Sequence, residues 1–221
     1  MSAGAVSIRS LPARYPDFST RCYAACKLAT DPLYAAVYEV LKATPAPLLD
    51  LGCGIGLLAF YLRERGWRGA VYGLDYDARK IASARAALAR SSATNMEFCQ
   101  GDARAELPAH CGSVTILDIL QFFPPEEQSR LLAAAAERVG PDGMLVIRSG
   151  LAMPGWRFNL TRWGDRLAAG CRWMRDGPVQ YPTAEGLRST LEAAGLRGDI
   201  RPLWGRTPFN NWLAVFRRAG S

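Results

Sequence analysis

The sequence predicts an α/β fold built on a mostly parallel sheet of seven strands with helices on both faces. Short apolar runs alternate with longer stretches of helical periodicity through the middle of the chain, a pattern typical of β-α-β units. A glycine-rich turn at residues 52–56 joins the first of these runs to a helical stretch. A chain of 221 residues is long enough to bury a core of its own.

The expected strands are short apolar runs bounded by glycine, proline or polar residues. They cover Leu48–Leu51, Ala70–Leu74, Asn95–Cys99, Val114–Ile119, Met144–Arg148, Leu196–Leu203 and Asn211–Arg217. The expected helices fill most of the gaps between the strands. They cover Leu57–Arg65, Ala78–Ala89, Glu126–Val139 and Thr183–Ala194, and an earlier helix opens at Pro32 with Asp31 as its cap.

We expect a single domain, residues 1–221, with four parts. Residues 1–46 form an N-terminal helical cap, and residues 47–148 form the core that carries the glycine-rich turn. Residues 149–181 interrupt the pattern after the fifth strand and form an inserted lid rich in arginine and tryptophan. Residues 182–221 complete the sheet with a helix and a strand hairpin.

The net charge of +7 comes from the last third of the chain. Up to Ile147, 15 basic residues are balanced by 15 acidic ones, whereas from Arg148 onward there are 12 arginines and 5 acidic residues. This excess predicts either an anionic partner or an ordinary solvated surface rich in arginine. No apolar run approaches the roughly 18 residues that span a bilayer, and no secretory signal is visible, so we expect a cytoplasmic protein.

The six cysteines and the single histidine do not suggest a metal site. No two cysteines have Cys-x-x-Cys spacing, and the histidine, His110, is followed directly by Cys111. We therefore expect no bound metal and reduced, mostly buried thiols. His110 precedes the fourth expected strand, which places it opposite the carboxyl ends of the strands, where ligands bind in such folds.

The most specific motif is Asp-x-Gly-x-Gly-x-Gly at residues 50–56, between an apolar strand and a helix. Its three glycines allow tight backbone dihedrals and let a ligand touch the main chain. Asp75 ends the next expected strand, 23 residues after Gly52, where a carboxylate can accept both hydroxyls of a ribose. A dinucleotide fingerprint would need another glycine at position 57, which is a leucine here.

With these motifs, the region from Pro47 to Arg148 resembles the class I S-adenosylmethionine-dependent methyltransferases, which have a Rossmann-like fold. The resemblance implies S-adenosylmethionine as the cofactor and a set of residues that bind it. This set contains Asp50, Gly52, Cys53, Gly54 and Gly56 in the loop, Asp75 at the ribose, Tyr76, Asp102 and Ala103 at the adenine, and Asp118 with Ile119 at the border of the substrate. The alternatives are a surface turn for Asp75 and a helix cap for Asp102.

Methyl transfer from a sulfonium is an in-line displacement, to which a protein contributes chiefly by aligning the two reactants. A base is needed only where the acceptor must lose a proton. Asp118 is the candidate for such a base, with Tyr15 or Tyr23 as alternatives, whereas His110 is poorly placed. Many relatives carry a histidine three residues after the acid, and this chain carries Gln121, which we assign to the substrate side.

A second resemblance concerns the acceptor. Residues 27–34 and 204–211 are similar to those of methyltransferases from aryl polyene or polyketide-pigment biosynthesis clusters. This resemblance implies an acceptor with an aromatic head group or an acyl chain, and it puts Lys27 and Arg206 in the substrate pocket.

The lid is the element in which we expect a partner to bind. Its apolar residues recur at helical spacing and predict a lid helix. They are Trp156, Leu160, Trp163, Leu167 and Met174. The arginines between them suit an acidic acyl carrier protein or an anionic substrate, an anionic lipid surface, or RNA.

We weigh four functions. The preferred one is methyl transfer to a small-molecule or carrier-tethered acceptor that is aromatic or anionic. An RNA methyltransferase is disfavoured, because the charge is confined to one region and no RNA-binding module is visible. The others are a non-catalytic cofactor-binding partner in a biosynthetic assembly and a nicotinamide dehydrogenase, which the loop spacing opposes.

Overall fold

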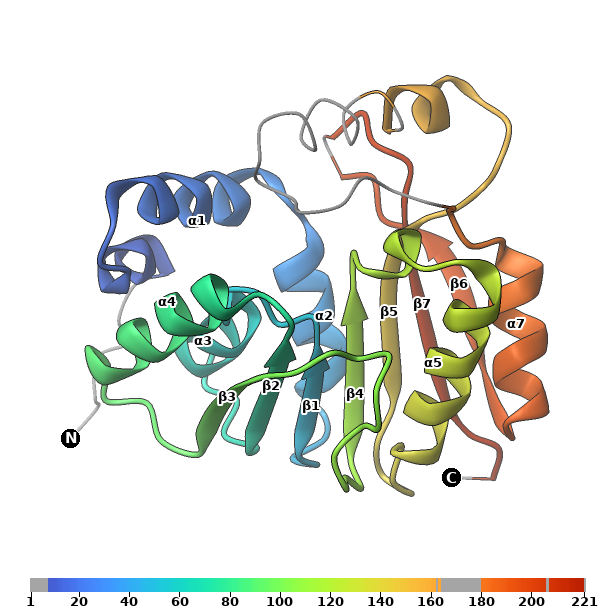
Figure 1. Cartoon of the computed structure of the whole chain (residues 1–221), viewed down its shortest axis with the longest axis horizontal. Helices are drawn as coiled ribbons and strands as arrows, with labels where there is room; N and C mark the ends of the chain where they lie inside the picture. The colour runs from blue at the N-terminus through green and yellow to red at the C-terminus, as the bar shows by residue number, and fades with distance from the viewer. Residues whose placement is uncertain (1–7, 162, 164–179, 206, 221) are drawn as a thin grey trace. The chain divides into compact units, whose positions relative to one another are not determined.

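The structure is a computed structural model of the chain, and it describes residues 8–161, 163, 180–205 and 207–220. Its seven strands have the order β3-β2-β1-β4-β5-β7-β6 (Figure 1). The predicted α/β class with a seven-stranded, mostly parallel sheet is confirmed. The chain has two compact units, Met1–Ala105 and Glu106–Ser221, and the division into four parts stays a prediction.

The first unit contributes three parallel strands and two helices that follow them. These are β1 (Leu48–Leu51), β2 (Val71–Asp75), β3 (Met96–Gln100), α3 (Leu57–Glu64) and α4 (Ala78–Ala89). β2 pairs with β1 on one side and with β3 on the other. All four residues of β1 are buried, which explains why this strand is almost continuously apolar in the sequence.

Three further helices precede β1 in the same unit. They are η1 (Ile8–Arg14), α1 (Phe18–Thr30) and α2 (Leu33–Leu41). The helix predicted to open at Pro32 is confirmed, because α2 begins at the next residue. The cap is Pro32 and not Asp31 as predicted, although the Asp31 carboxylate accepts a hydrogen bond from the Leu33 N–H at 3.0 Å.

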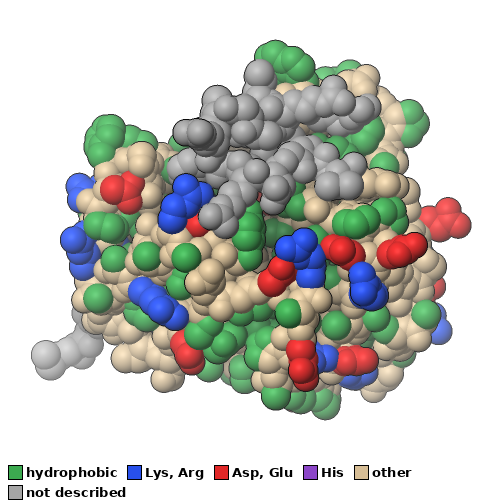
Figure 2. Space-filling model, viewed as in Figure 1, with side chains coloured by type: hydrophobic (Ala, Val, Ile, Leu, Met, Phe, Trp, Pro, Cys, Tyr) green, Lys and Arg blue, Asp and Glu red, His purple; other side chains and the backbone are tan. Residues whose placement is uncertain are grey.

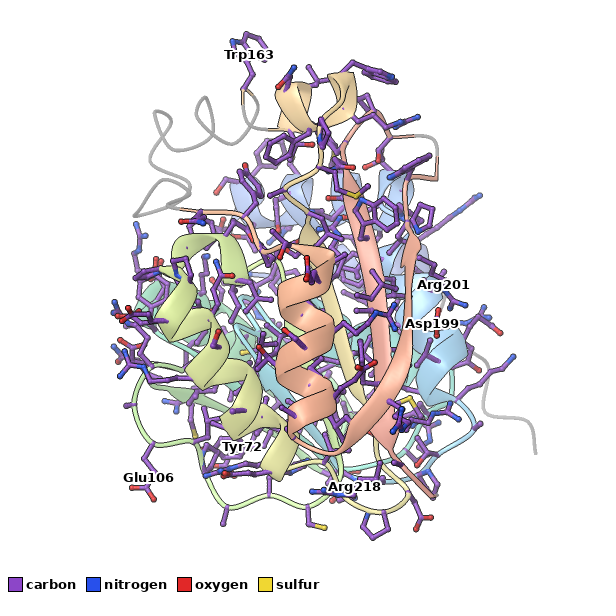
Figure 3. All side chains as sticks on the ribbon, turned by 90° about the vertical axis from the view of Figure 1, so that its right-hand side faces the viewer. Tyr72, Glu106, Trp163, Asp199, Arg201 and Arg218 are labelled. Atoms are coloured by element: carbon purple, nitrogen blue, oxygen red, sulfur yellow. The ribbon has the colours of Figure 1, made fainter. Side chains whose placement is uncertain are left out.

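The second unit contributes four strands and three helices among its described residues, besides a helical segment that begins at residue 156. These are β4 (Ser113–Leu117), β5 (Leu145–Gly150), β6 (Leu196–Pro202), β7 (Asn211–Arg218), η2 (Leu120–Phe122), α5 (Pro125–Glu137) and α7 (Ala184–Ala193). β4 and β5 are parallel, whereas β7 is antiparallel to both β5 and β6. β6 is an edge strand, and Asp199 and Arg201 lie at alternate exposed positions on it (Figure 3). Charges on an edge oppose pairing with strands of other chains.

The predicted strands occur, with ends that differ by one or two residues. β2 and β3 begin one residue later than expected, and β5 continues two residues further, to Gly150. The longer β5 exists because Ser149 and Gly150 pair with Trp212 and Asn211 of β7. The local periodicity of the sequence does not indicate that a strand pairs with another strand so far away in the chain.

Only the first part of the predicted lid lies among the described residues. Residues 156–161 and 163 are helical, and 64% of Trp156 and 61% of Trp163 is exposed. Two members of the predicted apolar stripe are therefore exposed. Leu167 and Met174 lie outside the described residues, so the continuous lid helix stays a prediction.

Arg157 ties this helical segment to the connection between β6 and β7. Its guanidinium lies between two indole rings, 4.6 Å from the centroid of Trp156 and 4.7 Å from that of Trp204. It also donates a hydrogen bond to the Thr207 carbonyl at 2.8 Å. This arginine therefore stabilises the fold through cation–π and hydrogen-bond contacts.

The arginine excess after residue 147 lies only partly within the described residues. On the face drawn in Figure 2, basic and acidic side chains are interspersed. Five of the 12 arginines after residue 147 lie outside the described residues, namely Arg162, Arg166, Arg172, Arg175 and Arg206. Within the described ranges, no helix is long and apolar enough to cross a membrane. The basic lid and the cytoplasmic location stay predictions.

The expectation of mostly buried thiols is wrong for the described cysteines. Cys53 is buried and Cys99 half-buried, whereas Cys22, Cys26 and Cys111 are exposed. Two of the exposed thiols lie on α1, a helix that buries little of its surface, so these cysteines are not core residues.

We expect the stability of α4 to depend on the ionisation of its cap, Asp77. Hydrogen bonds from Arg79, with an N–H at 2.9 Å and the guanidinium at 2.8 Å, lower the pKa of Asp77 to about 2. An unfolded aspartate titrates near about 3.9, so this stabilisation is complete above about pH 4 and is lost as the pH falls toward 2. The unfolding temperatures of wild type and Asp77→Asn should differ at about pH 6, and the difference should narrow progressively as the pH falls from about 4 toward 2. A constant difference would contradict the role of Asp77.

Candidate functional site

The loop between β1 and α3 has a backbone that glycine adopts readily. Gly52, Gly54 and Gly56 have φ angles of 76°, 56° and 73°, in the left-handed region that disfavours a Cβ. The N–H groups of Gly52 and Cys53 donate to the Leu74 carbonyl at 2.7 and 3.0 Å, and the Gly56 N–H donates to the Cys53 carbonyl at 2.9 Å. The loop is therefore fixed from within, and these N–H groups are engaged by the protein itself.

The two sides of the loop have different surroundings. A Cβ at Gly56 would lie 2.6 Å from the ring of Phe98, so a glycine is needed where the loop rests on β3. A Cβ at Gly54 would have no atom of the described residues within 4 Å. The open space at Gly54 lets a ligand approach the main chain, which fits the cofactor that the motif implies.

Asp75 holds the loop from the end of β2. Its Oδ2 accepts a hydrogen bond from the Gly54 N–H at 2.8 Å, and its Oδ1 accepts one from the Asp77 N–H at 2.8 Å. The residue is only 5% exposed. A carboxylate oxygen can accept more than one hydrogen bond, so Asp75 can bind ribose hydroxyls while it holds the loop. The sequence spacing indicated only the first of these roles.

Asp50 and Cys53 are buried beside the loop, with 2% and 8% of their surfaces exposed. Burial, with the carboxylates of Asp50 and Asp75 nearby, raises the pKa of the Cys53 thiol well above its usual value. The thiol is therefore neutral near pH 7 and is not a nucleophile. Its Sγ lies 2.9 Å from the position of a Cβ at Gly73, so this side chain packs tightly against β2.

The residues assigned to the adenine follow β2 and β3. Tyr76 is 40% exposed, so part of its ring surface can pack against a base. The Asp102 carboxylate accepts from the Arg104 N–H at 2.9 Å and pairs with the Arg104 guanidinium at 2.6 Å, which lowers the pKa of Asp102. Ala103 lies in a turn and not at the start of a helix, so the helix-cap alternative for Asp102 is wrong. The adenine contacts of these residues stay predictions.

In the second unit, Asp118 follows β4 with a φ of 60°, which few non-glycine residues adopt. Its N–H donates to the Arg148 carbonyl at 2.8 Å, and its carboxylate forms an ion pair with the Arg148 guanidinium. The Gln121 amide donates to the Asp118 carbonyl at 3.0 Å, and Ile119 between them precedes η2. The left-handed Asp118 ends β4 two residues earlier than predicted.

The structure places hydrogen bonds and an ion pair on two of the three candidate bases, Asp118 and Tyr15. The Asp118 carboxylate is paired with the buried Arg148 guanidinium, and its role as a base stays a prediction. Tyr15 does not serve as a base, because its hydroxyl donates to the Ile55 carbonyl at 3.1 Å and burial raises its pKa. Tyr23 stays a prediction.

His110 lies where the sequence placed it. A nitrogen of its ring is 2.9 Å from the carbonyl oxygen of Ser113, the first residue of β4. His110 therefore lies near the amino end of β4, whereas Asp118 follows the carboxyl end. In the described part of the chain, no three His, Cys, Asp or Glu side chains are grouped so that they could hold a metal ion.

Three residues were assigned to the substrate side. Lys27 forms an ion pair with Asp31 at 2.9 Å. Gln121 is 7% exposed, and its Oε1 has no hydrogen-bond partner among the residues that the structure describes. Arg206 lies outside the described residues. The substrate roles of all three stay predictions.

Sequence reasoning missed the roles of Phe98 and Arg148, and it considered Tyr15 only as an alternative base. Phe98 lies against the glycine loop and Tyr15 binds its backbone, yet both resemble ordinary core aromatic residues in the sequence. Arg148 pairs with Asp118 from β5. An arginine in a strand that is otherwise apolar was a usable signal for a buried ion pair.

Alanine substitutions at Gly54 and Gly56 should have different consequences. At Gly56 the added methyl group meets the Phe98 ring, so the free energy of unfolding should fall by about 2–4 kcal/mol through overpacking and backbone strain. At Gly54 it meets open space, so the fall should be about 1–2 kcal/mol, while S-adenosylmethionine affinity drops about tenfold or more. Denaturant unfolding and calorimetric titration measure the two effects. Equal destabilisation by both substitutions would contradict the difference between the two sides.

Asp75→Ala should raise the Kd for S-adenosylmethionine about 100-fold or more, because it removes the ribose acceptor and the partner of the Gly54 N–H together. The protein should stay folded, with an unfolding temperature lower by about 3–8 °C. Asp77→Ala is the matched control, since it removes the α4 cap at a cost of about 1 kcal/mol and should change the Kd by less than about threefold. Unchanged binding in Asp75→Ala would rule out the ribose role.

Comparisons with known proteins agree with this geometry. Residues 48–143 match the family model of a methyltransferase domain. Trans-aconitate 2-methyltransferase of Streptomyces coelicolor is 30% identical over 169 residues, covering 72% of this chain and 54% of that protein. The enzyme of the same name from Streptomyces avermitilis is 29% identical over 195 residues, covering 82% of this chain and 70% of that enzyme. The chain thus spans only about half the length of the first of these relatives.

A solved structure shares the fold. Magnesium protoporphyrin IX methyltransferase from Synechocystis PCC 6803, with bound S-adenosylhomocysteine, aligns with a TM-score of 0.64 at 18% identity, covering 92% of this chain and 88% of that one. Residues 48–143 of this chain therefore belong to the methyltransferase-domain family, and the chain shares the fold of a methyltransferase solved with S-adenosylhomocysteine.

Proposed function

We propose that the protein transfers the methyl group of S-adenosylmethionine to a small acceptor, aromatic or anionic, that is free or tethered to an acyl carrier protein. The relatives above are named for the methylation of trans-aconitate, a small carboxylate, and this supports the size class of the acceptor. The observation that carries the proposal is the unpartnered Oε1 of Gln121, among the described residues, close to the carboxyl end of β4.

Gln121 is suited to recognise a hydrogen-bond donor. Its Nε2 donates to the Asp118 carbonyl at 3.0 Å, which fixes the amide so that Oε1 is the remaining acceptor. A buried acceptor without a partner costs about 1–3 kcal/mol. A hydroxyl or amine of the acceptor molecule would recover this energy on binding, because ligands of open α/β sheets bind at the carboxyl ends of the strands.

The chain's own residues would act by binding and alignment. The sulfonium of S-adenosylmethionine supplies a methyl group with an activated leaving group. The glycine loop and Asp75 would hold the nucleoside, and the fixed geometry of Asp118, Arg148 and Gln121 would hold the acceptor. Alignment of this kind can contribute about 7–11 kcal/mol to catalysis. Because Asp118 is paired with Arg148, the acceptor atom would react as an anion or as an unprotonated nucleophile.

The resemblance to methyltransferases of aryl polyene or polyketide-pigment clusters extends this proposal. Under it, the acceptor has an aromatic head group or an acyl chain, and Lys27 and Arg206 contribute to its pocket. The excess of arginine after residue 147 suits an acidic carrier protein or an anionic substrate. Contact of the lid with an anionic membrane surface is a separate proposal that rests on the same excess of arginine.

The direct test is methylation of host material with methyl-labelled S-adenosylmethionine. Lysate of the host is separated into small molecules, proteins and RNA, and each fraction is incubated with the enzyme and analysed by mass spectrometry. We expect the label in a small molecule or on the prosthetic arm of a carrier protein. Label in RNA would contradict the proposal, and tight cofactor binding with no labelled product would favour a non-catalytic partner.

Gln121→Met should raise the KM for the acceptor identified in this way about tenfold, equivalent to about 1.4 kcal/mol. The Kd for S-adenosylmethionine should stay within about twofold, because Gln121 makes no hydrogen bond to the glycine loop or to Asp75. Gln128→Met is the matched control: Gln128 is also buried, but its Nε2 donates to the carbonyls of Phe123 and Gln180. The control should lower the unfolding temperature without changing KM. Equal KM values for both variants would contradict the role of Gln121.

A further inference from the structure

The N-terminal segment reaches the glycine loop through one side chain. Tyr15 follows η1 and is fully buried, with 0% of its surface exposed. Its hydroxyl donates a hydrogen bond to the carbonyl of Ile55 at 3.1 Å, although the two residues are 40 positions apart. Ile55 lies between Gly54 and Gly56, so this hydrogen bond fixes a peptide group in the middle of the loop.

A series of aromatic rings supports the same loop. The rings of Tyr15 and Phe60 meet edge to face at 6.2 Å, and the rings of Phe60 and Phe98 lie 5.8 Å apart. Phe98 in turn occupies the space in which a Cβ of Gly56 would lie, at 2.6 Å. The loop is therefore supported by Phe98 and held by Tyr15, which are themselves joined through Phe60.

Polar contacts keep Tyr15 in place. The Arg21 guanidinium donates from Nε to the Tyr15 carbonyl at 2.7 Å. Arg14 forms an ion pair with Glu64 of α3, and its guanidinium lies 5.8 Å from the centroid of the Phe60 ring. Contacts on both sides of Tyr15 thus hold its backbone where the hydroxyl reaches the loop.

We propose that Tyr15 is a positioning residue for the cofactor, and that the segment 8–15 is part of the cofactor-binding machinery. The peptide that Tyr15 fixes joins Ile55 to Gly56, and the N–H of this peptide donates to the Cys53 carbonyl at 2.9 Å. Loss of the tyrosine hydroxyl would free this peptide to rotate and disturb the loop around Gly54. A loop that is already ordered loses less conformational entropy when a ligand binds. The proposal rests on the cofactor site at the glycine loop and requires no knowledge of the acceptor.

The test compares two tyrosine-to-phenylalanine substitutions. Tyr15→Phe removes the hydrogen bond to the loop, whereas Tyr38→Phe removes a hydrogen bond of the same length, 3.1 Å, to the Arg65 carbonyl at the end of α3. Calorimetric titration with S-adenosylmethionine and S-adenosylhomocysteine gives the affinities without turnover. Failure of methyl transfer would therefore not affect the result.

We expect Tyr15→Phe to raise both Kd values about tenfold and Tyr38→Phe to leave them within about twofold. Circular dichroism and the unfolding temperature confirm that each variant is folded at the temperature of titration. Equal affinities in the two folded variants would overturn the proposal.

A measurement on the wild-type protein covers the case in which Tyr15→Phe does not fold. Coupling between two sites is reciprocal, so S-adenosylhomocysteine should slow amide hydrogen exchange in residues 8–15 as well as in residues 52–60. Protection confined to the loop, with residues 8–15 exchanging at the ligand-free rate, would overturn the proposal.

Discussion

The hydrogen bond between the Gly54 N–H and the Asp75 carboxylate is the contact on which the cofactor site depends. It joins the ends of two neighbouring parallel strands, because the loop follows β1 and Asp75 ends β2. Two further hydrogen bonds to the Leu74 carbonyl keep the same loop against β2. The carboxylate that would recognise a ribose is thus also the group that shapes the loop, so the loop and the nucleoside contact are built as one unit.

Close packing explains why the loop tolerates so little change. Gly56 and Gly73 both face the ring of Phe98 at distances that leave no room for a Cβ, and Cys53 fills the remaining space at Gly73. Protein interiors are packed as densely as organic crystals, so a single added methyl group must displace its neighbours. The open position at Gly54 is therefore meaningful, because it contrasts with filled space on the other side of the loop.

In the second unit the main constraint is that a charged side chain, Arg148, is buried. Arg148 lies in a buried strand with 5% of its side chain exposed, and the cost of its desolvation is offset by the ion pair with Asp118. The same pair stabilises the left-handed backbone of Asp118, a conformation that is costly for a residue with a Cβ. An aspartate used in this way orients neighbouring groups, which suits a reaction that depends on alignment more than on proton transfer.

Local pattern was enough to determine the strand and helix order, the glycine loop, Asp75 and the family, because apolar periodicity and short motifs are encoded within about ten to thirty residues. Only the tertiary structure decided that the loop amides are engaged within the protein, that Cys22 and Cys26 are exposed, and that Asp118 pairs with Arg148. Tyr15 is the clearest case, because its partner lies 40 residues away. Contacts between residues so far apart in the sequence depend on how the helices and strands pack against one another. The local sequence pattern does not contain this information.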